Sequence, residues 1–210
     1  MIFNKDAQES FYQLIRARRD VRSNFLQRPI PKDVITRIID AAQHAPSVAY
    51  LQPWNFILIE SLDTRKKILD NFHKCRKSES QKISAEKRAL YDSLKLEGII
   101  ESPLNICVTC DRDKDSNNVL GQSTEPQMDI YSTVCAIQNM WLAARVENIG
   151  MGWVSILEND FLRAILDIPK NVEIIGYFCL GYVDEFFDKP ELETKGWNHR
   201  HPPDIHYEKW

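Results

Sequence analysis

The segment from Gln127 to Asn148 constrains the fold more than any other part of the chain. Its apolar residues recur at intervals of three and four, which is the period of an α-helix. They are Ile130, Val134, Ile137, Trp141 and Ala144. The apolar surface extends well beyond one stripe, and such a helix needs cover on more than one side. We therefore expect this segment to be the central helix of the core.

The segments on either side of it alternate between helical and strand patterns. Periodicity predicts helices at Asp6 to Arg16, Lys32 to His44, Leu62 to Glu97 and Glu158 to Asp167. Apolar runs predict strands at Trp54 to Glu60, Leu104 to Cys110 and Glu173 to Val183, the first of them buried. The glycines in Ile149 to Ser155 predict a tight turn that a ligand can approach closely. Elements in this order favour an α+β layered structure over a regular βαβ array.

Composition sets limits on the class of protein. With 210 residues, 43% of them hydrophobic, the chain can bury one core, and we expect a single domain over residues 1–210. A net charge of -3 gives no general attraction to nucleic acid or anionic membranes, so any polyanion site must be local. The N-terminus lacks signal-peptide features, and the longest uncharged run, Ile130 to Ala144, is too short to span a bilayer. We expect a soluble cytoplasmic protein.

The cysteines and histidines do not indicate a metal or disulfide site. Five scattered cysteines are an odd number and make no disulfide framework. Cys107 and Cys110 match C-x-x-C, but a separation of three in a predicted strand places them on opposite faces. We therefore expect buried core cysteines. The five histidines show no zinc-binding spacing, and we expect no metal.

The best candidate for a site is the segment Arg16 to Arg22, where four arginines and Asp20 follow a predicted helix. Guanidinium groups make charge-assisted bidentate contacts with phosphate oxygens, so a phosphorylated cofactor is the first hypothesis. A solvated basic helix end, favourable to the helix dipole, is the alternative. No G-x-G-x-x-G or Walker sequence follows a strand, so we do not expect a dinucleotide-binding or P-loop site.

Several motifs, taken in this order, resemble the flavin-dependent nitroreductase superfamily over nearly the whole chain. They are Arg18-Arg19-Asp20-Val21-Arg22, Ala45-Pro46-Ser47-Val48, Gln52-Pro53-Trp54-Asn55, Gly152-Trp153-Val154-Ser155, Ile168-Pro169, and Gly196-Trp197 with Arg200. The resemblance implies a three-layer sandwich, with a mixed sheet flanked by helices. It also implies a domain-swapped homodimer with FMN bound at the subunit interface.

Within this superfamily the motifs are most similar to members that consume reduced FMN. For these, the resemblance implies O2 as co-substrate and dimethylbenzimidazole, the lower ligand of vitamin B12, as product with erythrose 4-phosphate. A separate flavin reductase would supply the FMNH2. Such members usually have Gly where this chain has Ala49, and this departure bears on the rate of the reaction. General nitroreductases usually carry Asn where this chain has Tyr50. An NAD(P)H-dependent FMN reductase of nitro compounds or quinones and a non-catalytic flavin-binding protein are the alternatives.

The resemblance also implies roles for individual residues. Arg18, Arg19 and Arg22 hold the phosphate and ribityl chain, Asp20 moves protons, and Ser155 lies near the flavin N5 edge. The other cofactor-binding positions are Val21, Pro46, Ser47, Ala49, Gln52 and Arg200. Asp20 could instead form an ion pair that merely orients a neighbouring arginine. Ser155 could instead cap the helix that starts near Glu158.

Two further segments carry expectations. The resemblance places a lid at about residues 70–85, where it would exclude water from the site. A charged helical face that is simply solvated is the alternative. Residues 111–126 have the composition of an exposed loop, and the extended tail 186–210 is expected to wrap over the core or a partner subunit. Trp54 is expected to pack in the core at the entry to a strand.

Overall fold

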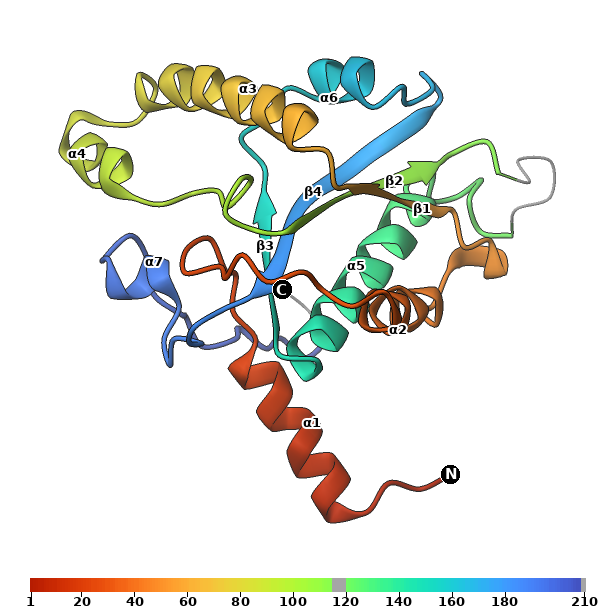
Figure 1. Ribbon diagram of the computed structural model, residues 1–210. Coiled ribbons are helices and arrows are strands. Elements are labelled where there is room, and N and C mark those ends of the chain that lie inside the picture. Colours follow the sequence, from red (N-terminus) through yellow and green to blue (C-terminus); the bar gives the residue numbers. More distant parts are fainter. Residues whose placement is uncertain (115–119, 209–210) are drawn as a thin grey trace.

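The computed structural model describes residues 1–114 and 120–208 and has an α+β architecture (Figure 1). The described strands form one sheet in the order β1-β2-β4-β3. They are β1 (Trp54–Ile59), β2 (Leu104–Asp111), β3 (Ile149–Val154) and β4 (Val172–Tyr182). All three pairings are antiparallel, so the expectation of a mixed sheet is wrong. Within the described residues, parallel pairing occurs only at the isolated bridge between Asp20 and Met151, because the segment after α1 meets β3 over a single residue.

Helices cover both faces of this sheet. They are α1 (Lys5–Ala17), α2 (Lys32–Gln43), the 3-10 turn η1 (Val48–Tyr50), α3 (Leu62–Ser80), α4 (Ala85–Ser93), α5 (Met128–Val146), α6 (Asn159–Ile165) and α7 (Glu191–Thr194). Figure 1 shows α2 and α5 on one face and α3 and α6 on the other. The three-layer sandwich is therefore confirmed.

Alternation along β2 separates the interior into two cores. Ile106 and Val108 pack with α2 and α5, whereas Cys107 belongs to the cluster formed with α3 and α6. Cys107 and Cys110 are both buried thiols, as expected. Burial raises the pKa of Cys107 to about 12 and that of Cys110 to about 11, so neither is a ready thiolate.

Helix α5 is the central helix, as its sequence predicted. Ala136, Met140 and Ala144 are fully buried against the sheet and α2. Its outer side is not covered, because Val134 and Val146 are 39% and 61% exposed. Apolar side chains of the most central helix thus remain on the surface of the single chain.

Helix α1 projects from the body of the molecule (Figure 1). The structure describes every residue of α1, and none of its side chains is buried. Phe11 and Ile15, which form its apolar stripe, are 52% and 42% exposed. The helix forms where the sequence predicted it, but its apolar stripe has no cover within one chain.

Three local expectations are wrong. The segment from Leu62 to Glu97 is not one helix, because α3 ends at Ser80 and α4 spans Ala85–Ser93. The segment predicted as a tight glycine turn is strand β3, and its glycines serve close packing instead. A Cβ at Gly152 would lie 1.9 Å from the carbonyl oxygen of Val21. Strand β1 is not fully buried, because it is an edge strand paired only with β2, and Asn55 and Leu58 are exposed.

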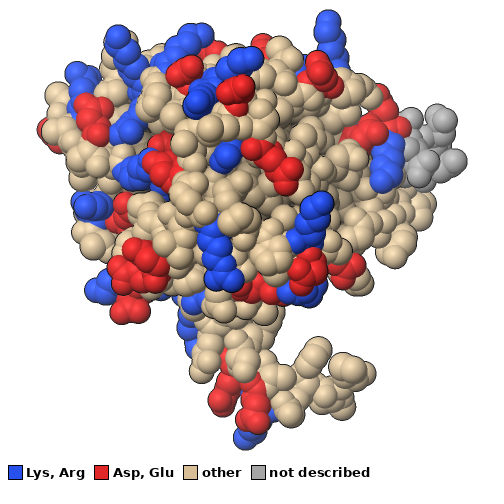
Figure 2. All heavy atoms as spheres, in the orientation of Figure 1, with Lys and Arg blue, Asp and Glu red and all other residues tan. Residues whose placement is uncertain are grey.

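Charges are mixed on the surface. Figure 2 shows basic and acidic side chains interspersed over the visible face, with no broad region of one sign. Across the described residues, every helix is too short or too polar to cross a bilayer. Part of the predicted exposed loop, residues 115–119, lies outside the described residues.

Candidate functional site

The arginine-rich segment leaves α1 and runs beside edge strand β3. The Val21 backbone N–H donates to the carbonyl oxygen of Met151 at 3.0 Å. The Trp141 indole N–H, from α5, donates to the carbonyl oxygen of Arg19 at 3.1 Å. The absence of a side chain at Gly152 allows this close approach. The backbone of the segment is thereby fixed between the sheet edge and the last turns of α5.

Asp20 is held in place by two contacts. Its Oδ1 accepts a hydrogen bond from the Trp153 backbone N–H at 3.0 Å, and its Oδ2 forms an ion pair with Arg22. Although 29% of its side-chain surface is exposed, burial raises the pKa of Asp20. Arg22 and the Trp153 N–H act in the opposite direction but less strongly. Burial therefore outweighs the neighbouring arginines, and Asp20 is a better proton acceptor than an exposed aspartate.

Two guanidinium groups, those of Arg22 and Arg18, act on this carboxylate. Arg18 lies over the Trp141 ring, 4.8 Å from its centroid. Burial lowers the pKa of Arg18, and the charges of Arg19 and Arg200 lower it further, against the opposing effect of Asp20. Arg200, from the C-terminal tail, is therefore close enough for its charge to act on Arg18.

Arg19 has a different set of partners. It donates to the carbonyl oxygens of Phe187 at 3.0 Å and Arg16 at 2.6 Å, and also to that of Asp188. It thus ties the start of the C-terminal tail to the end of α1. Within residues 1–114 and 120–208, no carboxylate forms an ion pair with Arg18 or Arg19. An arrangement of cations without matching anions is suited to an anionic ligand.

A second group of predicted residues surrounds η1. Ala49, Tyr50 and Gln52 all have φ in the left-handed region, at 48°, 57° and 49°. The Gln52 N–H donates to Ser47 Oγ at 3.1 Å. Pro46 immediately precedes this segment and is exposed. The left-handed φ of Ala49 is a conformation that glycine adopts at lower cost.

The two groups lie at opposite ends of α5. The Val48 N–H donates to Ser132 Oγ, near the start of α5, at 3.0 Å. The arginine segment contacts Trp141 and Arg145 near its end. These contact points are nine and thirteen residues from Ser132, which is about 14 and 20 Å along a helix. Within one chain, residues 46–52 therefore lie away from the arginine cluster.

Ser155 follows the end of β3, two residues beyond the Trp153 whose N–H binds Asp20. It is exposed and lines a cavity of about 200 Å³ with Trp153 and Tyr177 among its walls. The alternative role as a helix cap is wrong. Glu158 is the N-cap of α6, its side chain makes no capping hydrogen bond, and its backbone N–H donates to Asn71 Oδ1 at 3.0 Å.

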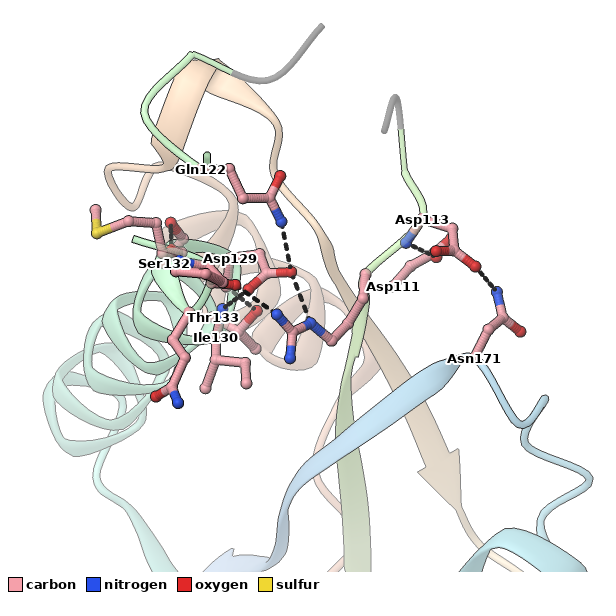
Figure 3. A network of polar contacts seen from close by, with 12 residues as sticks. Asp111, Asp113, Gln122, Asp129, Ile130, Ser132, Thr133 and Asn171 are labelled. Carbon is pink, nitrogen blue, oxygen red and sulfur yellow. Dashed lines mark hydrogen bonds and ion pairs between the residues drawn. The ribbon is translucent and has the colours of Figure 1, made fainter. Parts of the chain in front are cut away.

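The sequence reasoning missed a polar network at the start of α5 (Figure 3). Asp129 is fully buried and accepts hydrogen bonds from Arg112 Nε at 3.0 Å and Gln122 Nε2 at 3.1 Å. Lys114, two residues after Arg112, donates to the carbonyl oxygen of Gln52 at 2.7 Å. An acidic residue in the first turn of a helix is common for dipole reasons, so Asp129 alone gave no signal.

The predicted lid begins in a well-packed part of the chain. Asn71 and Phe72 are buried, and Asn71 is hydrogen-bonded to Glu158 at 2.9 Å. The remaining part includes the end of α3 and the turn that leads to α4. The tail contacts α4, where the rings of Tyr91 and Trp197 are 6.2 Å apart.

The chain is similar to known proteins in both sequence and fold. The model of the nitroreductase family matches residues 15–182. A 5,6-dimethylbenzimidazole synthase of Rhodospirillum rubrum is 38% identical over 201 residues, covering 96% of this chain and 95% of the relative. One of Rhodobacter capsulatus is 34% identical over 202 residues, covering 96% and 97%. A crystal structure of iodotyrosine deiodinase bound to FMN and 3-iodo-L-tyrosine has a TM-score of 0.77 at 18% identity, covers 95% of this chain and 100% of that one, and shows the fold alone.

Proposed function

The chain belongs to the nitroreductase family, and from that premise we propose that it catalyses the oxygen-dependent fragmentation of reduced FMN. The products are 5,6-dimethylbenzimidazole and erythrose 4-phosphate. The observation that carries the proposal is the 38% identity, over 96% of this chain, to a relative named 5,6-dimethylbenzimidazole synthase.

The arginine cluster fits the phosphate of FMN. Arg18 and Arg200 are close enough for their charges to interact, and no acidic side chain in the described residues is ion-paired with Arg18. A phosphate dianion would supply the missing negative charge, with Arg19 holding the tail that carries Arg200. Reduced FMN, when bound, supplies the ring that reacts with O2 and becomes the product, and a separate flavin reductase provides it.

Asp20 and Ser155 are the groups that act on the reacting ring. Ring fragmentation requires proton transfers, and Asp20, with its raised pKa and fixed orientation, accepts a proton. The Ser155 hydroxyl is free of a capping role and hydrogen-bonds at the flavin edge. Both are placed by β3, since Asp20 is bound to Trp153 and Ser155 follows two residues later.

The functional unit is a homodimer. The loop around Ala49 and the arginine cluster lie at opposite ends of α5. A second copy packed on α5 in the opposite direction would place the Ala49 loop of one protomer beside the arginine cluster of its partner. The exposed apolar residues Phe11 and Ile15 on α1, and Val134 on α5, are surface that such a partner would cover.

The lid and the tail act on this site from outside it. Residues 70–85 close over the flavin, with movement confined to the part after the buried Phe72. Residues 186–210 bring Arg200 to the phosphate and pack Trp197 against α4.

Hydrogen exchange tests the proposed lid. Exchange of residues 73–85 is expected to slow when FMN is added, and equal exchange with and without FMN would refute the lid.

The test is incubation of the purified protein with reduced FMN in air, followed by mass analysis for dimethylbenzimidazole. We expect the product, and no product from a heat-denatured sample. Direct bleaching of bound FMN by NADPH, without product, would instead identify an NAD(P)H-dependent reductase. Bound FMN with neither reaction would identify a flavin-binding protein.

A further inference from the structure

The backbone from Ala49 to Gln52 is unfavourable for the residues it contains. Three of its four residues, Ala49, Tyr50 and Gln52, have left-handed φ although none is glycine. Such conformations persist only where the surrounding structure holds them. The contacts that hold this segment therefore decide whether it keeps its shape.

Local contacts hold only part of the segment. Ser132 Oγ accepts from the Val48 N–H, and Ser47 Oγ accepts from the Gln52 N–H. The carbonyl of Gln52 lies beyond their reach and accepts from Lys114 Nζ at 2.7 Å. Lys114 lies three residues after the end of β2, whose Asp111 N–H donates to the carbonyl oxygen of Pro53 at 2.8 Å, so it reaches Gln52 from the neighbouring strand.

The two residues before Lys114 are held by contacts with other elements, and Figure 3 shows the polar network to which they belong. Arg112, two residues earlier, is ion-paired at 3.0 Å with Asp129, which is fully buried at the start of α5. Asp113, one residue earlier, accepts from Asn171 Nδ2 at 3.0 Å. A flexible lysine side chain loses less freedom when the residues just before it are held in this way.

We propose that Lys114 is a positioning residue that keeps the Ala49–Gln52 segment in its flavin-binding conformation. The inference rests on the proposed function, in which Ala49 and Gln52 are cofactor-binding positions, and it assigns them to the flavin ring. Lys114 acts through the Gln52 carbonyl and not through the phosphate. Its effect is therefore the same for a flavin with a phosphate and for one without.

The test compares Lys114→Met with the unaltered protein for binding of oxidised FMN and of riboflavin, followed by flavin fluorescence. If the competent conformation falls to about a tenth of the population, both dissociation constants rise about tenfold. The melting temperature stays unchanged because Lys114 is exposed. Lys114→Arg, which keeps a cationic donor, restores most of the affinity. Lys66→Met, an exposed lysine on α3, is the matched control and changes neither constant.

Two results would overturn the inference while leaving the proposed function intact. One is unchanged affinity of Lys114→Met for both flavins. The other is a loss confined to FMN, since that result would make Lys114 a phosphate ligand. Failure of the unaltered protein to bind either flavin would overturn the proposed function, and the inference with it.

Discussion

Replacement of Asp20 by Asn separates its proposed catalytic role from its structural one, because the two side chains have nearly the same shape. The Asn Oδ1 can still accept from the Trp153 N–H, but the Nδ2 then faces Arg22, which is also a donor. Loss of a charge-assisted hydrogen bond costs about 1.5–3 kcal/mol. Removal of a carboxylate whose pKa is raised by burial acts in the opposite direction. We expect the net stability change to stay within about 1.5 kcal/mol, a shift of at most about 6 °C in melting temperature.

The effect on rate is much larger. Loss of a general base lowers a rate about 10²–10⁴-fold, which corresponds to about 3–5 kcal/mol of transition-state free energy. Affinity for FMN is expected to stay within a few-fold, because the phosphate contacts proposed for Arg18 and Arg200 are untouched. The assay is dimethylbenzimidazole formation by mass analysis, with FMN affinity and melting temperature measured on the same sample. Asp63→Asn, an exposed aspartate on α3, is the control and keeps the full rate.

The pH dependence gives a second readout of the same residue. Because burial raises the pKa of Asp20 above 3.8, the rate rises as pH increases through that raised pKa. Asp20→Asn lacks this rise. For stability, the contribution of Asp20 is fully present below its unfolded pKa and is lost as pH rises through its folded pKa. Asp20→Asn with normal FMN binding, an unchanged rate and an unchanged pH profile would refute the proton-acceptor role.

Three further substitutions test separate parts of the site. Arg200→Ala is expected to weaken FMN binding about tenfold and to leave riboflavin binding unchanged in a fluorescence titration; an equal loss for both flavins would rule out a phosphate contact. Ser155→Ala is expected to lower the rate of product formation about 10²-fold without changing the melting temperature, and a full rate would assign the residue no catalytic role. Gly152→Ala places a Cβ 1.9 Å from the Val21 carbonyl oxygen, so we expect destabilisation of more than about 3 kcal/mol, seen in denaturant unfolding; wild-type stability would show that the segment after α1 is free to move.

The sequence predicted most elements because their periodicity is local. Helix α5 and strand β4 are apolar enough to be recognised without their partners. Strand β3 was not predicted because its glycines are typical of a turn. Glycine is needed at position 152 because the backbone of Val21, more than a hundred residues earlier, lies against it. No local sequence pattern indicates this contact.

The site was predictable to the extent that charge clusters are visible along the chain. The arginines and Asp20 stand out, but the direction of the pKa shift does not, because burial outweighs the neighbouring charges only in the folded protein. Arg112 and Lys114 lie in no recognisable motif. Their importance follows from the tertiary contacts with Asp129 and Gln52.

The exposed stripes mark another limit of local patterns. Periodicity predicted helix α1 correctly, yet it does not tell whether the apolar side with Phe11 and Ile15 faces the same chain or a partner. The structure of one chain leaves that side exposed.

The central claim, that reduced FMN is itself consumed, is tested most directly with FMN carrying ¹³C in the isoalloxazine ring. The flavin is reduced, mixed with the protein in air, and followed to completion by mass analysis. We predict labelled dimethylbenzimidazole in an amount equal to the FMN lost. Complete recovery of intact labelled FMN, with no labelled product, would contradict the account.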